Sequence, residues 1–145
     1  MAKLASLSSV SSQFPTLEVE FEDLIGIRYV KDGRTPEEGM DCLGVVIEVF
    51  KRAGLALPDP RSTGRIDDFT DIFEEVSEPN NLFDIINLRG GLNHILVVVR
   101  PGIVLSSRDG GVGGGVYTAS VSNIIRCVPL GVPVKYWRVR SDSLP

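Results

Sequence analysis

Cys42 is the residue best placed for nucleophilic chemistry, because it directly follows Asp41 at the start of the strongest helical pattern in the sequence. A thiol at a helix N-terminus lies near free backbone N–H groups and the positive end of the helix dipole, and both favour the nucleophilic thiolate. The same N–H groups can stabilise an oxyanion during acyl transfer. Gly44 is expected to leave room for substrate beside the sulfur. The competing interpretation is a small buried apolar residue, which describes most isolated cysteines.

His94 is the single histidine of the chain, and it opens the apolar run at residues 94–99. A neutral imidazole at the start of a strand can accept the proton of a facing thiol. The alternative is a surface or core-edge histidine with a satisfied hydrogen bond. A cysteine on a helix followed by a histidine on a strand is the papain-type order, in which a third polar group fixes the imidazole. Together, Cys42 and His94 predict a nucleophile and its general base.

The helix that positions Cys42 is predicted at residues 41–53, with Asp41 as N-cap and Gly54 as left-handed C-cap. Its apolar face consists of Val45, Val46, Val49 and Phe50. Helical spacing also predicts a helix at residues 17–25 and a short acidic helix at Asp67–Val76. Residues 31–40 and 57–65 are rich in glycine and proline and are predicted as loops.

The second half of the chain changes to the spacing of β-strands. The predicted strands are Phe83–Leu88, His94–Arg100, Ile103–Ser106, Val116–Val121 and Val134–Val139. Pro101-Gly102 predicts a hairpin turn. Residues 109–115 are predicted as a flexible Gly-rich tip, and residues 122–126 as a turn or short helix. Helices first and strands after predict an α+β domain with an antiparallel sheet. We expect residues 1–16 to form an extended arm and residues 17–145 to form one domain.

Composition excludes several classes of function. The chain has 145 residues, of which 43% are hydrophobic and 23% charged, as in globular proteins. The net charge of −4 and the scattered basic residues argue against nucleic-acid binding. The longest apolar run is about six residues, far below the roughly 20 that span a bilayer. The first residues carry no apolar stretch typical of a signal peptide.

The two cysteines lie in different contexts and are expected to be reduced, with Cys127 buried and inert. One histidine and two separated cysteines offer no zinc site. The acidic cluster Asp67, Asp68 and Asp71 is interpreted as a solvated helix start. No metal site is therefore expected.

Three stretches of the sequence resemble the signature of the NlpC/P60 family of cysteine peptidases. That signature is Gly-x-x-Tyr, a Gly/Pro loop, and Asp-Cys-x-Gly-Leu-Val at the start of a helix. The matching residues are Gly26-Ile27-Arg28-Tyr29, Gly33, Pro36 and Gly39-Met40-Asp41-Cys42-Leu43-Gly44-Val45-Val46. Phe83-Asp84-Ile85-Ile86 is similar to the family's Gly-Asp-Leu-Val strand, with Phe83 in the usual place of glycine. The resemblance covers roughly residues 17–140.

The resemblance implies a papain-like NlpC/P60 fold with Cys42 as nucleophile and His94 as base. Tyr29 would line the site, Asp41 would support the turn before the helix, and Gly44 would border the substrate. The family's third polar residue, often a second histidine, usually sits on the strand after the first. Ser106 falls at that position, and Asn93 or Asn87 are the alternatives.

The implied reaction is amide hydrolysis through a thioester, with peptidoglycan stem peptides as substrate and the bond after D-glutamate as the typical target. The resemblance implies no metal and no organic cofactor. Without an export signal, the chain resembles the domains of phage tail modules. We therefore expect a tail-tip or baseplate component that is made in the host cytoplasm and carried in the virion beside other tail proteins. A structural tail or baseplate subunit with a weakened site is the first alternative, and an intracellular acyltransferase or amidase is the second.

Overall fold

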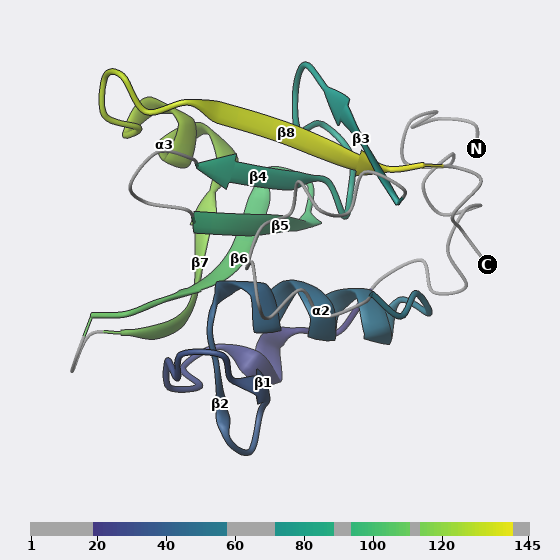
Figure 1. Ribbon diagram of the computed structural model, residues 1–145, viewed down its shortest axis with the longest axis vertical. Helices are drawn as coiled ribbons and strands as arrows, with labels where there is room; N and C mark the ends of the chain where they lie inside the picture. Colours follow the sequence, from purple (N-terminus) through teal and green to yellow (C-terminus); the bar gives the residue numbers. More distant parts are fainter. Residues whose placement is uncertain (1–18, 58–71, 89–93, 111–113, 141–145) are drawn as a thin grey trace.

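A computed structural model describes residues 19–57, 72–88, 94–110 and 114–140 of the chain (Figure 1). Its helices are the 3₁₀ helix η1 (Glu22–Leu24), α2 (Cys42–Arg52) and α3 (Val121–Arg126). Its strands are β1 (Arg34–Thr35), β2 (Gly39–Met40), β3 (Phe73–Val76), β4 (Ile85–Leu88), β5 (His94–Arg100), β6 (Ile103–Arg108), β7 (Gly115–Ser120) and β8 (Val134–Val139). The predicted arm at residues 1–16 lies outside the described residues.

The larger sheet is antiparallel throughout and has the strand order β3-β8-β4-β5-β6-β7. Strands β1 and β2 pair separately as a small hairpin. Helix α2 packs on β5 and β6, and Figure 1 shows the β1–β2 hairpin on the side of the helix away from β4 and β5. The predicted α+β class, with helical segments packed on an antiparallel sheet, is confirmed.

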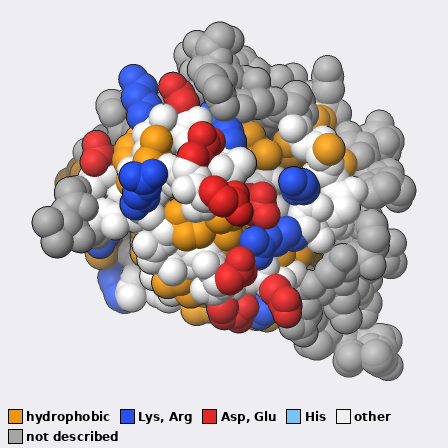
Figure 2. Space-filling model, turned by 90° about the horizontal axis from the view of Figure 1, so that it is seen from below, with side chains coloured by type: hydrophobic (Ala, Val, Ile, Leu, Met, Phe, Trp, Pro, Cys, Tyr) orange, Lys and Arg blue, Asp and Glu red, His pale blue; other side chains and the backbone are white. Residues whose placement is uncertain are grey.

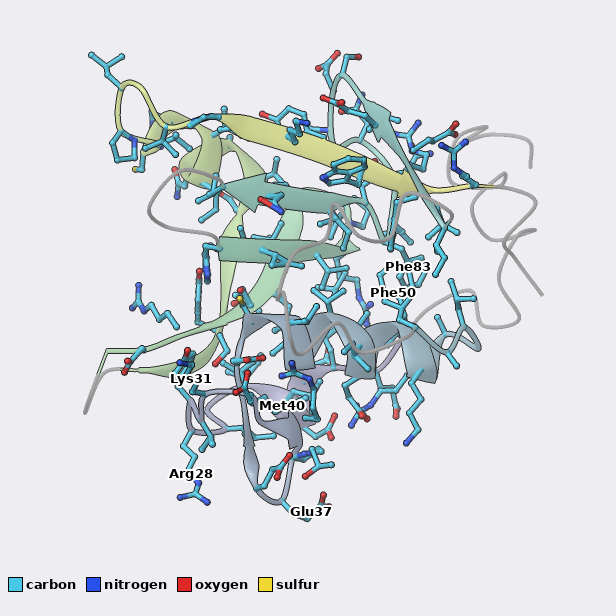
Figure 3. The ribbon with its side chains drawn as sticks, viewed as in Figure 1. Arg28, Lys31, Glu37, Met40, Phe50 and Phe83 are labelled. Carbon is cyan, nitrogen blue, oxygen red and sulfur yellow. The ribbon has the colours of Figure 1, made fainter. Side chains whose placement is uncertain are left out.

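Helix α2 forms where the sequence predicts it. Oδ1 of Asp41 accepts a hydrogen bond from the Gly44 N–H at 2.8 Å, which makes Asp41 the N-cap. Gly54 follows the last turn with φ +98°, in the left-handed region that favours glycine. The predicted apolar face is buried. Its Phe50 lies close to Phe83 above the helix, with 5.8 Å between the ring centroids (Figure 3).

The register of the sheet places the predicted site residues on adjacent strands. His94, at the start of β5, lies opposite Leu88 of β4. Ser106 of β6 lies opposite Tyr117 of β7. The predicted hairpin between β5 and β6 is confirmed, and its turn contains Gly102 with φ +76°. Residues 95–99 of β5 are all buried, so the strand that carries His94 is fixed on both faces.

The predicted helix at residues 17–25 is wrong over the part that the structure describes. Only the 3₁₀ turn η1 forms there. Phe21 and Leu24 are buried, but Ile25 is 45% exposed. Gly26 then turns the chain with φ +91° and donates its N–H to the Val116 carbonyl. Pairing with the start of β7 therefore takes the backbone away from a continuing helix.

The predicted acidic helix at Asp67–Val76 is also wrong at its described end. Phe73–Val76 forms β3 and pairs with β8 at the edge of the sheet. Phe73 is buried and the two following glutamates are exposed, so the strand keeps an apolar and a polar face. Tertiary pairing has overridden a helical sequence pattern, as often happens for short segments. Residues 67–71 lie outside the described residues.

Among the described residues, no helix is long and apolar enough to cross a membrane. The face seen in Figure 2 carries acidic and basic side chains side by side rather than in separate blocks of one sign.

Candidate active site

The described residues form a pocket of about 390 Å³ where the start of α2 meets the start of β5. Cys42 and His94 both line it. The remaining polar lining includes Tyr29, Arg108, Asp109 and Tyr117. Residues that are far apart in the sequence therefore line one cavity. Three of them, Tyr29, Cys42 and His94, are predicted site residues.

Cys42 is half-buried at the first position of α2. Burial raises the pKa of its thiol, and the negative charge of Asp41 acts in the same direction. Backbone N–H groups of Ile95 and Leu43 point to the sulfur and oppose the rise. The helix N-terminus thus acts as the sequence predicts, but burial outweighs it. The resting form of Cys42 is therefore the neutral thiol.

His94 is neutral at rest as well. Burial lowers the pKa of its imidazole, and the positive charge of Arg108 lowers it further. Nε2 lies 2.9 Å from the Tyr117 hydroxyl and 3.3 Å from Oγ of Ser106. No hydrogen bond joins the ring to the Cys42 sulfur within the described part of the chain.

Ser106 is fully buried on β6 and donates its hydroxyl hydrogen to the Ile95 carbonyl at 2.7 Å. It has the position that the sequence analysis gave to the third polar residue. Tyr117 lies nearer to the imidazole and is missing from the sequence-based set. The sequence predicts the two strands of this pair but not their register, and it is the register that places Tyr117 of β7 opposite Ser106.

Of the two asparagine alternatives, Asn87 does not reach His94. It lies on β4 next to Leu88, and it is Leu88 that pairs with His94, so Asn87 projects from the other face of the sheet. Its buried Oδ1 has no hydrogen-bond partner. Asn93 lies outside the described residues.

Tyr29 lines the pocket as the resemblance implies. Burial raises the pKa of its phenol, and the charge of Asp41 adds to the rise. The phenol is therefore a neutral donor beside the sulfur. It can orient a substrate carbonyl by hydrogen bonding.

Asp41 holds the turn before α2 together and does not line the pocket. Besides capping the helix, its carboxylate accepts hydrogen bonds from Nη1 of Arg34 at 2.8 Å and from the Asp32 N–H at 2.9 Å. The carboxylate thus accepts from two donors of the loop, Asp32 and Arg34, and from one donor in the first turn of the helix, Gly44. This network fixes the point at which α2 begins, and with it the position of the Cys42 sulfur.

Gly44 has a packing role instead of the predicted open space for substrate. It is buried, and a Cβ atom at this position would collide with the Gly33 carbonyl. Glycine lets the loop before β1 approach the first turn of α2.

Arg108 and Asp109 are exposed at the pocket and carry opposite charges. The guanidinium of Arg108 lies over the Tyr117 ring, 4.9 Å from its centroid. The described residues contain no group of three or more His, Cys, Asp or Glu side chains that could hold a metal ion. Cys127 is free and exposed, which corrects the prediction that it is buried.

Comparisons with known proteins bear on the fold. No family model matches the sequence, and no curated protein matches it. Among solved structures, the chain is similar to a lipoprotein-like protein of the NLP/P60 family from Staphylococcus aureus subsp. aureus Mu50, with 18% identity and a TM-score of 0.55. The match covers 89% of this chain and 41% of that one. The likeness shows an NlpC/P60-like fold, as the sequence resemblance predicted.

Proposed function

We propose that the protein is a cysteine-dependent amide hydrolase of NlpC/P60 type, with Cys42 as nucleophile and His94 as general base. The observation that carries the proposal is the shared pocket of these two side chains, in which Nε2 of His94 is already occupied by polar neighbours. Nδ1 is left as the ring atom to receive a proton. Cysteine–histidine pairs of this kind serve acyl transfer in several unrelated folds.

The reaction runs in two halves. Nδ1 of His94 takes the thiol proton while Sγ of Cys42 attacks the substrate carbonyl, and backbone N–H groups at the start of α2 stabilise the oxyanion. The C–N bond then breaks, and the leaving amine takes the proton from the imidazolium. A water molecule, deprotonated by the same imidazole, attacks the thioester. The acid leaves, and the thiol regains its proton.

The proposed substrate is a peptidoglycan stem peptide. The sequence resemblance supports this choice, and so does the NlpC/P60-like fold. Arg108 and Asp109 add a chemical reason, because opposite charges beside the pocket suit a substrate that carries both carboxylate and ammonium groups near the scissile amide. Stem peptides carry both.

The test is digestion of purified peptidoglycan, with the fragments identified by mass spectrometry. The wild-type protein should release stem-peptide fragments, and Cys42→Ala should release none. Cys127→Ala is the matched control, since that thiol is exposed and outside the pocket, and it should behave as wild type. Cleavage that survives Cys42→Ala would refute the assignment of the nucleophile.

A structural subunit with a weakened site is the second candidate function. The raised pKa of Cys42 and the lack of a hydrogen bond between its sulfur and the His94 ring favour it, because both features lower reactivity. In either case we place the protein in a phage tail tip or baseplate, a prediction from the sequence resemblance. Mass spectrometry of purified virions tests this location, and a protein found only in the host cytoplasm would contradict it.

A further inference from the structure

The imidazole of His94 contacts the sheet through Tyr117, a residue that is not part of the motifs that carry the family resemblance. Tyr117 comes from β7 and His94 from β5, with β6 between them. The phenol oxygen lies 2.9 Å from Nε2, and the two rings are nearly parallel, with 8° between their planes. Oγ of Ser106 lies 3.3 Å from the same nitrogen.

The positions of the hydrogens follow from Ser106. Its hydroxyl hydrogen is committed to the Ile95 carbonyl at 2.7 Å. Oγ therefore offers only lone pairs to its other neighbours. The hydrogen in the contact between Oγ and Nε2 of His94, which are 3.3 Å apart, must therefore lie on Nε2.

With a hydrogen on Nε2, the phenol oxygen at 2.9 Å accepts from it. The opposite arrangement, in which the phenol donates to Nε2, would leave a lone pair of Ser106 facing the lone pair of Nε2. The consistent arrangement is one chain, in which Nε2–H donates to Tyr117 with Ser106 as a second, more distant acceptor, and Ser106 donates to the carbonyl of Ile95.

We propose that Tyr117 is the positioning residue of His94, and that this hydrogen-bond chain holds the imidazole as the Nε2–H tautomer with Nδ1 unprotonated. Ser106, whose own hydrogen is committed to Ile95, sets the direction of the bond between His94 and Tyr117. Arg108 lies over the Tyr117 ring and helps to keep it in place. The consequence for catalysis rests on the proposed function, since only a base with a free Nδ1 can take the thiol proton. The tautomer itself does not rest on it.

The experiment uses ¹⁵N-labelled histidine in the untagged full chain. Because the chain contains one histidine, its two ring nitrogens give unambiguous long-range ¹H–¹⁵N signals. The wild-type protein should show a protonated Nε2 and an unprotonated Nδ1 above the His94 pKa. A protonated Nδ1 as the main form would overturn the proposal.

Two variants test the direction of the chain. Tyr117→Phe removes an acceptor that binds imidazolium more strongly than imidazole, so the His94 pKa should fall. A rise would mean that the phenol donates to Nε2 and would overturn the proposal. Ser106→Ala removes the lone pair that opposes donation by the phenol to Nε2, so the tautomer should shift toward Nδ1–H. The double variant should lose that shift, because phenylalanine has nothing to donate. An unchanged tautomer in Ser106→Ala would also overturn the chain.

Kinetics on a cleaved stem peptide give the second readout. Tyr117→Phe should lower kcat about tenfold, the equivalent of one hydrogen bond, with KM unchanged. The acid limb of its pH profile should move to lower pH together with the His94 pKa. If no peptide is cleaved by any variant, the proposed function fails while the NMR signals still decide the tautomer.

Discussion

At the scale of single residues, burial sets the protonation state of the two groups that the proposed mechanism uses. It raises the pKa of the Cys42 thiol and lowers the pKa of the His94 imidazole, so both groups are driven to their neutral forms. No preformed thiolate–imidazolium pair results. In the proposed mechanism, nucleophilic attack must therefore coincide with proton transfer, which makes the orientation of His94 important.

The reactivity of Cys42 toward iodoacetamide should reflect this resting state. In the Cys127→Ala variant, where Cys42 is the remaining thiol, the alkylation rate should climb with pH to a midpoint above about 8.5, the ordinary value for a thiol. The sign follows from the raised pKa, since the reactive thiolate then appears at higher pH. Intact-mass spectrometry over a pH series measures the rate. A rate that is already at its plateau at neutral pH would contradict the neutral thiol.

The residues that the sequence could identify were those with a local signature. Cys42 and Tyr29 belong to neighbouring motifs of the same signature, and both line the pocket. Tyr117 has no such signature, because its contact with His94 depends on the register of three strands. The role of Gly44 was misjudged for a related reason. Its neighbour, the Gly33 carbonyl, approaches only after the loop before β1 has folded back.

At the scale of elements, the first turn of α2 is held from three directions. Asp41 caps the helix, and Gly44 lies against the Gly33 carbonyl. From the sheet, Oγ of Ser107 on β6 donates to the carbonyl of Met40, directly before the cap, at 2.8 Å. Figure 3 shows Met40 just below α2. Cys42 therefore sits on a turn that is fixed to both the hairpin and the sheet.

Gly44→Ala tests this packing through the sign of its effect. Alanine in place of glycine inside a helix normally stabilises by up to about 1 kcal/mol. Here the new Cβ meets the Gly33 carbonyl, and we expect the free energy of unfolding to fall by about 1–3 kcal/mol. Urea denaturation measures it. Lys51→Ala, on the exposed side of the same helix, is the control and should change stability by less than about 0.5 kcal/mol. A stabilised Gly44→Ala would show that the loop does not press on the helix.

Strong local signals explain which elements the sequence could predict. The cap, apolar face and Gly54 defined α2, and the apolar run at residues 94–99 defined β5. Strands β5 and β8 both have the predicted bounds. The failures were short segments whose partners are distant. Strand β3 exists because β8 pairs with it, and η1 stops because Gly26 bonds to β7. The spacing of apolar residues along a short segment does not indicate such contacts.

At the scale of the whole molecule, one buried ion pair ties the central strands of the sheet together. Asp84, directly before β4, is 1% exposed, and its carboxylate binds Arg138 of β8 through two hydrogen bonds of 2.9 and 2.7 Å. The same carboxylate accepts from the Asn81 N–H at 2.9 Å. The Asp84 carbonyl accepts from Val98 of β5. Three strands therefore meet at this residue.

A second pair provides a matched comparison at the surface. Asp23 and Arg52 join η1 to α2 through two hydrogen bonds of 2.7 and 3.0 Å, with the same chemistry and similar geometry. They differ in burial, because the Asp23 side chain is 61% exposed. The two pairs thus separate the effect of burial from that of the ion pair itself.

Asp84→Ala should lower the free energy of unfolding by about 3 kcal/mol, because it leaves the Arg138 guanidinium and the Asn81 N–H without their partner inside the sheet. The value lies at the low end for broken buried pairs, since Arg138 is 31% exposed and water can replace part of the loss. Asp23→Ala should cost less than about 1 kcal/mol, because water already competes for its pair. Urea denaturation of both variants at one pH and salt concentration gives the comparison. Equal losses would mean that the contact itself, and not its burial, stabilises the protein, and that the junction of β4, β5 and β8 is no firmer than the surface.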